Sequence, residues 1–261
     1  MSRFSDLFKS EKPIIGMIHL PPLPDYDGSP GLSAIIDSAL NDLKVLEAMG
    51  VDGALIENEY DQPHRVEATP ETISAMTSVT RAVVEASDKC VIGVEILLND
   101  PKASLDVAKA ARAQFVRTDY FVDPMSRPQY GEFNINPEDV ITHRHKIGAD
   151  QILILADIQV KYAKMLIDRT MEQSASLAQK HLADAIVVSG HETGNAPVTD
   201  DLDAAKRGCS IPVIIGSGTD ALNVTSLLSH CDGAIVGTAL MKDKVVDIDK
   251  TKKLMSTLGR F

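Results

Sequence analysis

Ionisable side chains stand at the ends of short apolar runs in this 261-residue sequence. Each run has the length of a buried strand. If the runs form one parallel sheet, their carboxyl ends meet at one edge and the polar side chains converge there. The candidates for proton transfer and charge stabilisation are His19, Glu57, Glu95, Arg117, Asp119, Asp157 and Lys161.

Two acids follow the second apolar run. Glu57 and Glu59 are two residues apart, so extended backbone would point both side chains the same way. Neighbouring carboxyl groups separate their pKa values and can act as an acid and a base, or they can hold Mg²⁺ through oxygen ligands. Alternatively, one of them only pairs with Arg117 or Lys161. We favour Glu57 as functional, leave Glu59 and Mg²⁺ open, and assign no metal ligand.

The other charged candidates have competing explanations. Glu95 lies inside an apolar strand, where an ion pair with Arg117 is as consistent as a catalytic role. Asp157 ends the run ILILAD, and Lys161 follows four residues later, where a helical turn would place both on one side. We favour neutralisation of a phosphate, or a surface position, over a Schiff base for Lys161.

The histidines differ in how well their positions suit a role in the site. His19 ends the first apolar run and is either a structural residue or a base. His191 is a weaker candidate in a later loop. His64, His181 and His230 are expected at solvated positions.

The segment 211–241, IPVIIGSGTDALNVTSLLSHCDGAIVGTALM, predicts a phosphate-binding unit. Two strand-like runs each end in small residues, and Leu222, Leu227 and Leu228 mark a helix between them. Glycines let backbone N–H groups approach a ligand, and a helix starting just after them adds partial positive charge. Such a unit is often built after strands 7 and 8 of a (β/α)8 barrel, whereas the alternative is two tight turns. The predicted phosphate-binding residues are Ser189, Gly190, Gly216, Ser217, Gly218, Gly237 and Thr238.

Strand and helix patterns alternate along the chain and would position these residues. The expected strands cover 13–20, 51–56, 91–97, 115–116, 152–155, 185–188, 212–215 and 234–236. Eight such runs in a chain close to the typical ~250 residues predict one (β/α)8 TIM barrel with parallel strands over residues 1–261. Residues 1–12 form a leading arm or helix. Loops at 21–31 and 120–136 are expected at the carboxyl edge, and 162–168 has no clear assignment.

Composition limits the partners. A formal net charge of −11 argues against a nucleic-acid surface. The three cysteines have no paired metal spacing and suit free thiols in a reducing cytoplasm. No apolar run is long enough to span a bilayer. We therefore expect a cytoplasmic protein whose partner is a small phosphorylated metabolite, without nucleic acid or a transmembrane segment, and we leave a homo-oligomer open.

Several motifs resemble the BtpA/SgcQ family. They include PIIGMIHLPPLP, DGALIENEYDQP, LADIQVKYA, SGHETG and IIGSGTDALN, in the family's order along nearly the whole chain. The resemblance implies a TIM barrel of the ribulose-phosphate-binding type. It also implies a link either to photosystem I accumulation, from which the family name comes, or to sugar metabolism. Glu95 and Asp119 place acids where the family pattern is neutral, which indicates a divergent subgroup.

The leading functional prediction is an enzyme that acts on a phosphorylated sugar or related compound by acid/base chemistry, of isomerase, epimerase or lyase type. Glu57 and Asp157 would move protons, and Lys161 and Arg117 would stabilise developing negative charge, with His19 assisting.

Two alternatives remain open. The first is a non-catalytic assembly or biogenesis factor with a photosystem I-type role, as the family name suggests. The second is a metal-dependent hydrolase of a nucleoside-like substrate, with the metal held by Glu57, Glu59, Glu95 or Asp119.

Overall fold

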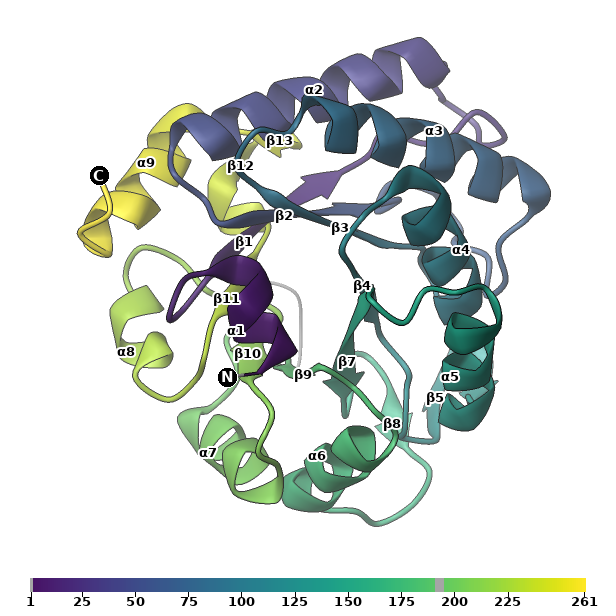
Figure 1. The fold of residues 1–261 in the computed structure, drawn as a ribbon, viewed down its shortest axis with the longest axis vertical. Helices are drawn as coiled ribbons and strands as arrows, with labels where there is room; N and C mark the ends of the chain where they lie inside the picture. The colour runs from purple at the N-terminus through teal and green to yellow at the C-terminus, as the bar shows by residue number, and fades with distance from the viewer. Residues whose placement is uncertain (1, 191–194) are drawn as a thin grey trace.

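The apolar runs of the sequence form the strands of a closed barrel. The computed structural model describes residues 2–190 and 195–261. Within these residues, eight parallel strands close in the order β1-β11-β10-β9-β7-β4-β3-β2, as Figure 1 shows. They are β1 (Ile14–His19), β2 (Gly53–Glu57), β3 (Val91–Glu95), β4 (Phe115–Thr118), β7 (Leu153–Ile158), β9 (Ala185–Val188), β10 (Val213–Ile215) and β11 (Ala234–Val236). The predicted TIM barrel is confirmed.

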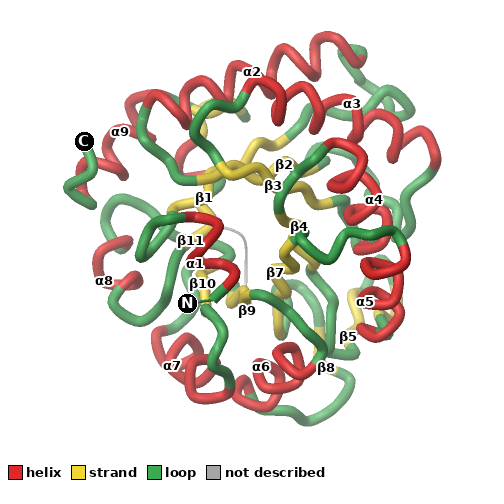
Figure 2. Tube along the Cα trace, in the orientation of Figure 1, coloured by secondary structure: helices red, strands yellow, loops and turns green. Residues whose placement is uncertain are grey.

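Helices surround the strands in an outer ring, red around yellow in Figure 2. They are α2 (Leu32–Ala48), α3 (Pro70–Ala86), α4 (Pro101–Ala111), α5 (Pro137–Lys146), α6 (Met171–Lys180), α7 (Thr199–Gly208), α8 (Val224–Leu228) and α9 (Ile248–Thr257). Local signals set several starts. The side chains of Thr69, Asp100 and Asn136 cap α3, α4 and α5, each with proline in the first turn.

Two segments differ from their sequence patterns. The pattern predicts an irregular loop over 120–136, but β5 (Met125–Arg127) and β6 (Gly131–Phe133) form an antiparallel hairpin there. The unassigned stretch 162–168 contains β8 (Lys164–Met165), which pairs with β5 on its other edge. These pairings satisfy backbone groups that a loose loop would leave to water.

The helix of the predicted phosphate unit is shorter than its pattern. It begins at Val224 and has five residues. Leu222, expected on its apolar face, is 89% exposed. After β11, the chain forms a 3-10 turn, η1 (Thr238–Leu240), and a small antiparallel pair, β12 (Met241–Lys242) and β13 (Val245–Val246).

The core is aliphatic and fills the barrel as well as the space under the helices. Strands β2, β3 and β7 are buried along their whole length, as expected for a parallel sheet covered on both faces. Gly93 leaves room for an aromatic ring, because a Cβ there would lie 2.2 Å from the side chain of Phe115.

The leading residues form helix α1 (Arg3–Phe8), which lies across the centre of the ring in Figure 1. Phe4 and Phe8 are buried, and the Phe8 ring lies 5.7 Å from that of Phe115. Phe8 also packs against Gly53, the first residue of β2. Helix α1 therefore covers the end where the strands begin, and the opposite end is left for a site.

Candidate active site

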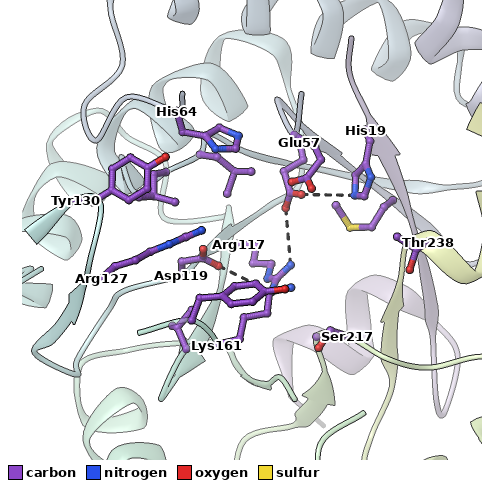
Figure 3. A pocket seen from close by; sticks show the side chains of 18 of the residues that line it. His19, Glu57, His64, Arg117, Asp119, Arg127, Tyr130, Lys161, Ser217 and Thr238 are labelled. Carbon is purple, nitrogen blue, oxygen red and sulfur yellow. Dashed lines mark ion pairs between the residues drawn. The ribbon is translucent and has the colours of Figure 1, made fainter. Parts of the chain in front are cut away.

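The carboxyl ends of the barrel strands surround a cavity of about 220 Å³. Drug-sized ligands occupy sites of ~300 Å³ or more, so this cavity suits a small metabolite. Figure 3 shows the side chains that face it. The predicted residues that line it are His19, Glu57, Arg117, Asp119, Lys161, Gly216, Ser217, Gly218, Gly237 and Thr238. The predicted residues Glu95, Asp157, Ser189 and Gly190 lie outside this lining.

An ion pair between Arg117 and Asp157 forms the floor. Arg117 Nε donates to Asp157 Oδ2 at 2.7 Å, and Nη2 donates to Oδ1 at 2.9 Å. Ser189 Oγ also donates to Oδ1, at 3.1 Å. Burial disfavours the charge of Arg117, but Asp157 and the other acids raise its pKa well above the usual value. Because both oxygens of Asp157 are occupied, it fits a role in holding Arg117 better than the proton transfer expected from the sequence.

Three further carboxyl groups approach the Arg117 guanidinium. The closest nitrogen–oxygen distances are 3.8 Å to Glu57, 3.7 Å to Glu95 and 3.9 Å to Asp119. Like charges this close raise one another's pKa, so these acids cannot all be ionised around one cation. The site must therefore hold protons at neutral pH.

Glu95 holds one of these protons and shares it with Glu57. Burial raises the pKa of Glu95 well above its usual value, against the opposing charge of Arg117. Burial also opposes ionisation of Glu57, but the hydrogen bond from Glu95 and nearby positive charges bring the pKa of Glu57 below its usual value. The two residues are direct neighbours in the register of β2 and β3. Glu57 is thus the ionised acceptor and Glu95 the neutral donor.

Glu59 and Asp119 change charge close to neutral pH. Burial, helped by the charge of Glu57, raises the pKa of Glu59 to about 7. Burial, helped by the charge of Asp157, raises the pKa of Asp119 to about 6. Both face the cavity. A carboxyl group with a pKa near the working pH is the best suited to accept and return a proton. Glu59, which the sequence left open, is therefore the strongest candidate base.

His19 and Lys161 complete the ionisable wall. His19 Nε2 lies 3.6 Å from Glu57 Oε2, and burial lowers the pKa of His19, so its ring is neutral at pH 7. Lys161 lies in a turn after β7 rather than on a helix shared with Asp157. Its charge helps to lower the pKa of Glu57, which places it as a cation beside the acids.

The ends of β10 and β11 supply backbone donors on another side of the cavity. The N–H groups of Ser217, Gly218 and Thr238 donate to no acceptor within residues 2–190 and 195–261. Successive N–H groups of this kind form a binding site for an anion. This side of the cavity is consistent with the predicted phosphate site.

Three of the other predicted phosphate-binding residues form hydrogen bonds within the fold. The Gly216 N–H donates to the Val188 carbonyl at 2.9 Å, and the Gly190 N–H donates to Ser217 Oγ at 3.1 Å. The Ser189 hydroxyl is bound to Asp157. Helix α8 adds little charge at these glycines, because the helix dipole falls off within a turn and α8 starts several residues later.

A further wall of the cavity is formed by residues that the sequence pattern did not predict. Arg127, Tyr130 and Tyr162 line it from the β5–β6 hairpin and the turn before β8. His64, expected at a solvated position, also lines it, and burial lowers the pKa of His64. The basic and aromatic residues of this hairpin were a signal, but only its pairing with β8 turns them toward the barrel.

Among the described residues, no group of three or more His, Cys, Asp or Glu side chains could hold a metal ion. The described helices include none that is long and apolar enough to cross a membrane. His191, the weaker candidate, lies outside the described residues.

The comparisons with known proteins agree with the motifs. Residues 10–260 match the BtpA family. Photosystem I biogenesis protein BtpA of Synechocystis sp. is 33% identical over 242 residues, which cover 90% of this chain and 82% of that protein. Putative sgc region protein SgcQ of Escherichia coli is 31% identical over 250 residues, which cover 94% and 92%.

A solved structure shares the architecture. Thiamine phosphate pyrophosphorylase from Pyrococcus furiosus superimposes with a TM-score of 0.61 and covers 97% of this chain and 98% of that one. At 15% identity, this likeness concerns the fold alone. The match over residues 10–260 and the two relatives show that the chain belongs to the BtpA family.

Proposed function

We propose that this protein is a cytoplasmic enzyme that acts on a small phosphorylated sugar or related compound by acid/base chemistry. One observation carries the proposal. A single small cavity holds the backbone N–H groups of Ser217, Gly218 and Thr238, which donate to no acceptor among the described residues, together with Glu59, whose pKa is about 7. Phosphate held at those donors would orient the reacting carbons over the acids.

Glu59 is the proposed base. It takes a proton from a carbon next to a carbonyl group, and the electron pair of the broken C–H bond moves onto the carbonyl oxygen. Lys161 and Arg117 stabilise the negative charge that develops there. Delivery of the proton to the former carbonyl carbon gives isomerisation, with the carbonyl oxygen gaining a proton and the neighbouring hydroxyl group losing one. Protonation of the original carbon from the opposite face gives epimerisation. A lyase would reach the same enolate by breaking a carbon–carbon bond instead.

A binding experiment tests the phosphate site. We expect inorganic phosphate, ribulose 5-phosphate or glucose 6-phosphate to raise the melting temperature, while ribulose and glucose do not. At saturation the shift should be about 5 °C or more. Gly237→Asp should abolish it, because a side chain there starts 3.4 Å from His19 Cε1 and carries a negative charge into the cavity. Ser226→Asp, on an exposed residue of α8, is the charge-matched control and should keep the shift.

A second experiment tests the chemistry. The compounds that bind are incubated with the protein in D2O, and NMR follows deuterium at the carbon next to the carbonyl group. Wild type should catalyse the exchange, and Glu59→Gln should lose at least about 100-fold in rate, within the range for a general base. Binding without exchange would contradict the proposed enzymatic activity.

That outcome would favour the second candidate function, a non-catalytic role in assembly. This candidate rests on the relative from Synechocystis sp., a photosystem I biogenesis protein, at 33% identity. An absence of binding by any phosphorylated compound would reject the phosphate site itself.

A further inference from the structure

Arg127 stands at the cavity wall. Among the described residues, no Asp or Glu forms an ion pair with its guanidinium. Arg117 and Arg169, by contrast, each pair with an aspartate at 2.7 Å. In a chain with a formal net charge of −11, a guanidinium that faces a small cavity and has no acidic partner among the described residues is a feature that a ligand would explain.

Two aromatic rings hold this guanidinium in place. Its central carbon lies 5.3 Å from the centre of the Tyr130 ring and 5.6 Å from that of Tyr162. Cation–π contacts use the face of a guanidinium and leave the N–H groups at its edge for another partner. One donor of Arg127 reaches the hydroxyl group of buried Tyr120, and no acidic side chain among the described residues takes the others.

The position of Arg127 relative to the phosphate site sets the shape of a ligand. Figure 3 shows Arg127 beside Tyr130 on one side of the cavity and Ser217 with Thr238 on the other. Glu57 and Arg117 lie between the two sides. A molecule that reached both sides would cross the ionisable residues with its middle carbons.

We propose that Arg127 binds a carboxylate at the end of the substrate opposite the phosphate, so that the substrate is a phosphorylated sugar acid. This inference rests on the proposed function, which places the phosphate at the N–H groups of Ser217, Gly218 and Thr238. A carboxylate is planar and accepts two parallel hydrogen bonds from the edge of a guanidinium. His64 stands on the same side as a neutral ring, since burial and the charge of Arg127 both lower its pKa.

Matched ligand pairs test the carboxylate directly. 6-Phosphogluconate and glucitol 6-phosphate share a phosphate and a carbon chain, but one ends in a carboxylate and the other in a hydroxymethyl group. 4-Phosphoerythronate and erythritol 4-phosphate form a shorter pair. By calorimetry, we expect the acid of the pair that spans the cavity to bind wild type at least about tenfold more tightly than its alcohol, as for a hydrogen bond between charged groups.

Variants assign the effect to Arg127. Arg127→Gln should reduce the affinity for the acid to that for its alcohol and leave the affinity for the alcohol unchanged. Arg127→Lys should keep part of the preference for the acid. Arg65→Gln is the matched control, because Arg65 also lies over a tyrosine ring, that of Tyr26, but outside the cavity lining. This control should keep the full preference.

Three results would overturn the inference and leave the proposed function standing. They are equal binding of acid and alcohol, equal weakening of both by Arg127→Gln, and tighter binding of glucitol 1,6-bisphosphate than of 6-phosphogluconate. The last result would assign a second phosphate to Arg127. Failure of every phosphorylated compound and of inorganic phosphate to bind would instead reject the proposed function, on which the inference depends.

Discussion

The chemistry of single residues in this cavity follows from how many charges share a small buried volume. Arg117 is surrounded by Glu57, Glu95, Asp119 and Asp157, and its two short hydrogen bonds go to Asp157 alone. The remaining acids divide their protons according to burial and to neighbouring charge. Glu59, two residues past the end of β2, reaches a pKa of about 7.

The pKa of Glu59 predicts a pH dependence of stability. Its value of about 7 in the folded protein lies above the ordinary 4.5, so the folded state keeps a proton that the unfolded chain has lost between pH 4.5 and 7. The free energy of unfolding therefore falls as pH rises through that window. Wild type should lose about 1–3 kcal/mol more than Glu59→Gln between pH 5 and pH 8. Urea unfolding at four pH values measures the difference.

A control separates Glu59 from the general effect of removing an acid. Glu85→Gln, on an exposed residue of α3, should follow the wild-type pH dependence. If Glu59→Gln followed the wild-type curve as well, Glu59 would not carry the raised pKa.

At the scale of elements, one buried carboxylate, that of Asp123, joins two loops at the carboxyl end of the barrel. Asp123 Oδ2 accepts from the Gln159 N–H at 2.9 Å, and Oδ1 accepts from Ser174 Oγ at 2.8 Å and Arg169 Nη1 at 2.7 Å. Asp123 lies between β4 and β5, and Gln159 immediately follows β7. The bonds thus tie the segment with Lys161 to the one with Arg127.

Loss of this carboxylate should loosen the Lys161 segment. Asp123→Asn puts an N–H donor where three donors converge. Loss of the charged acceptor should lower the free energy of unfolding by about 2–3 kcal/mol. Hydrogen exchange followed by mass spectrometry should show faster exchange over 159–169, with the barrel strands unchanged. Ser174→Ala removes one bond to Asp123 and the bond that Ser174 Oγ accepts from Gln159 Nε2 at 3.2 Å, but it keeps the carboxylate, so it should speed exchange in that segment less than Asp123→Asn does. Uniformly faster exchange would indicate global destabilisation and contradict a local anchor.

At the scale of the whole molecule, the packing of helix α1 and the cavity lie at opposite ends of the barrel. Helix α1 covers the end where the strands begin, with Phe4 and Phe8 in the core, and the cavity lies at the other end. This division is usual for (β/α)8 barrels, in which the carboxyl end carries the chemistry.

Truncation of Phe8 should therefore lower stability and leave ligand binding intact. Phe8→Ala should cost about 3–5 kcal/mol in the free energy of unfolding, because a buried ring is removed. The dissociation constant of inorganic phosphate, measured well below the melting temperature, should change less than about twofold. Exposed Phe261 gives the matched control, and Phe261→Ala should change neither quantity. Weaker phosphate binding by Phe8→Ala would show that the two ends are coupled.

The sequence by itself determined the barrel and the edge at which its polar residues gather. Strand-length apolar runs alternate with helical patterns. Each run can be recognised from its own residues, whatever segments it packs against in the fold. His19, Glu57 and Arg117 face the cavity because they end or follow such runs. The regular alternation also predicted the closed topology.

Only the tertiary structure decided which polar atoms remain available. Asp157 is occupied by Arg117, forty residues earlier in the chain, and the N–H of Gly216 is occupied by Val188 of a neighbouring strand. Arg127 enters the cavity because β5 pairs with the distant β8. Hydrogen bonds between such distant segments leave no local pattern, since a partner is chosen by position in space and by burial rather than by spacing along the chain.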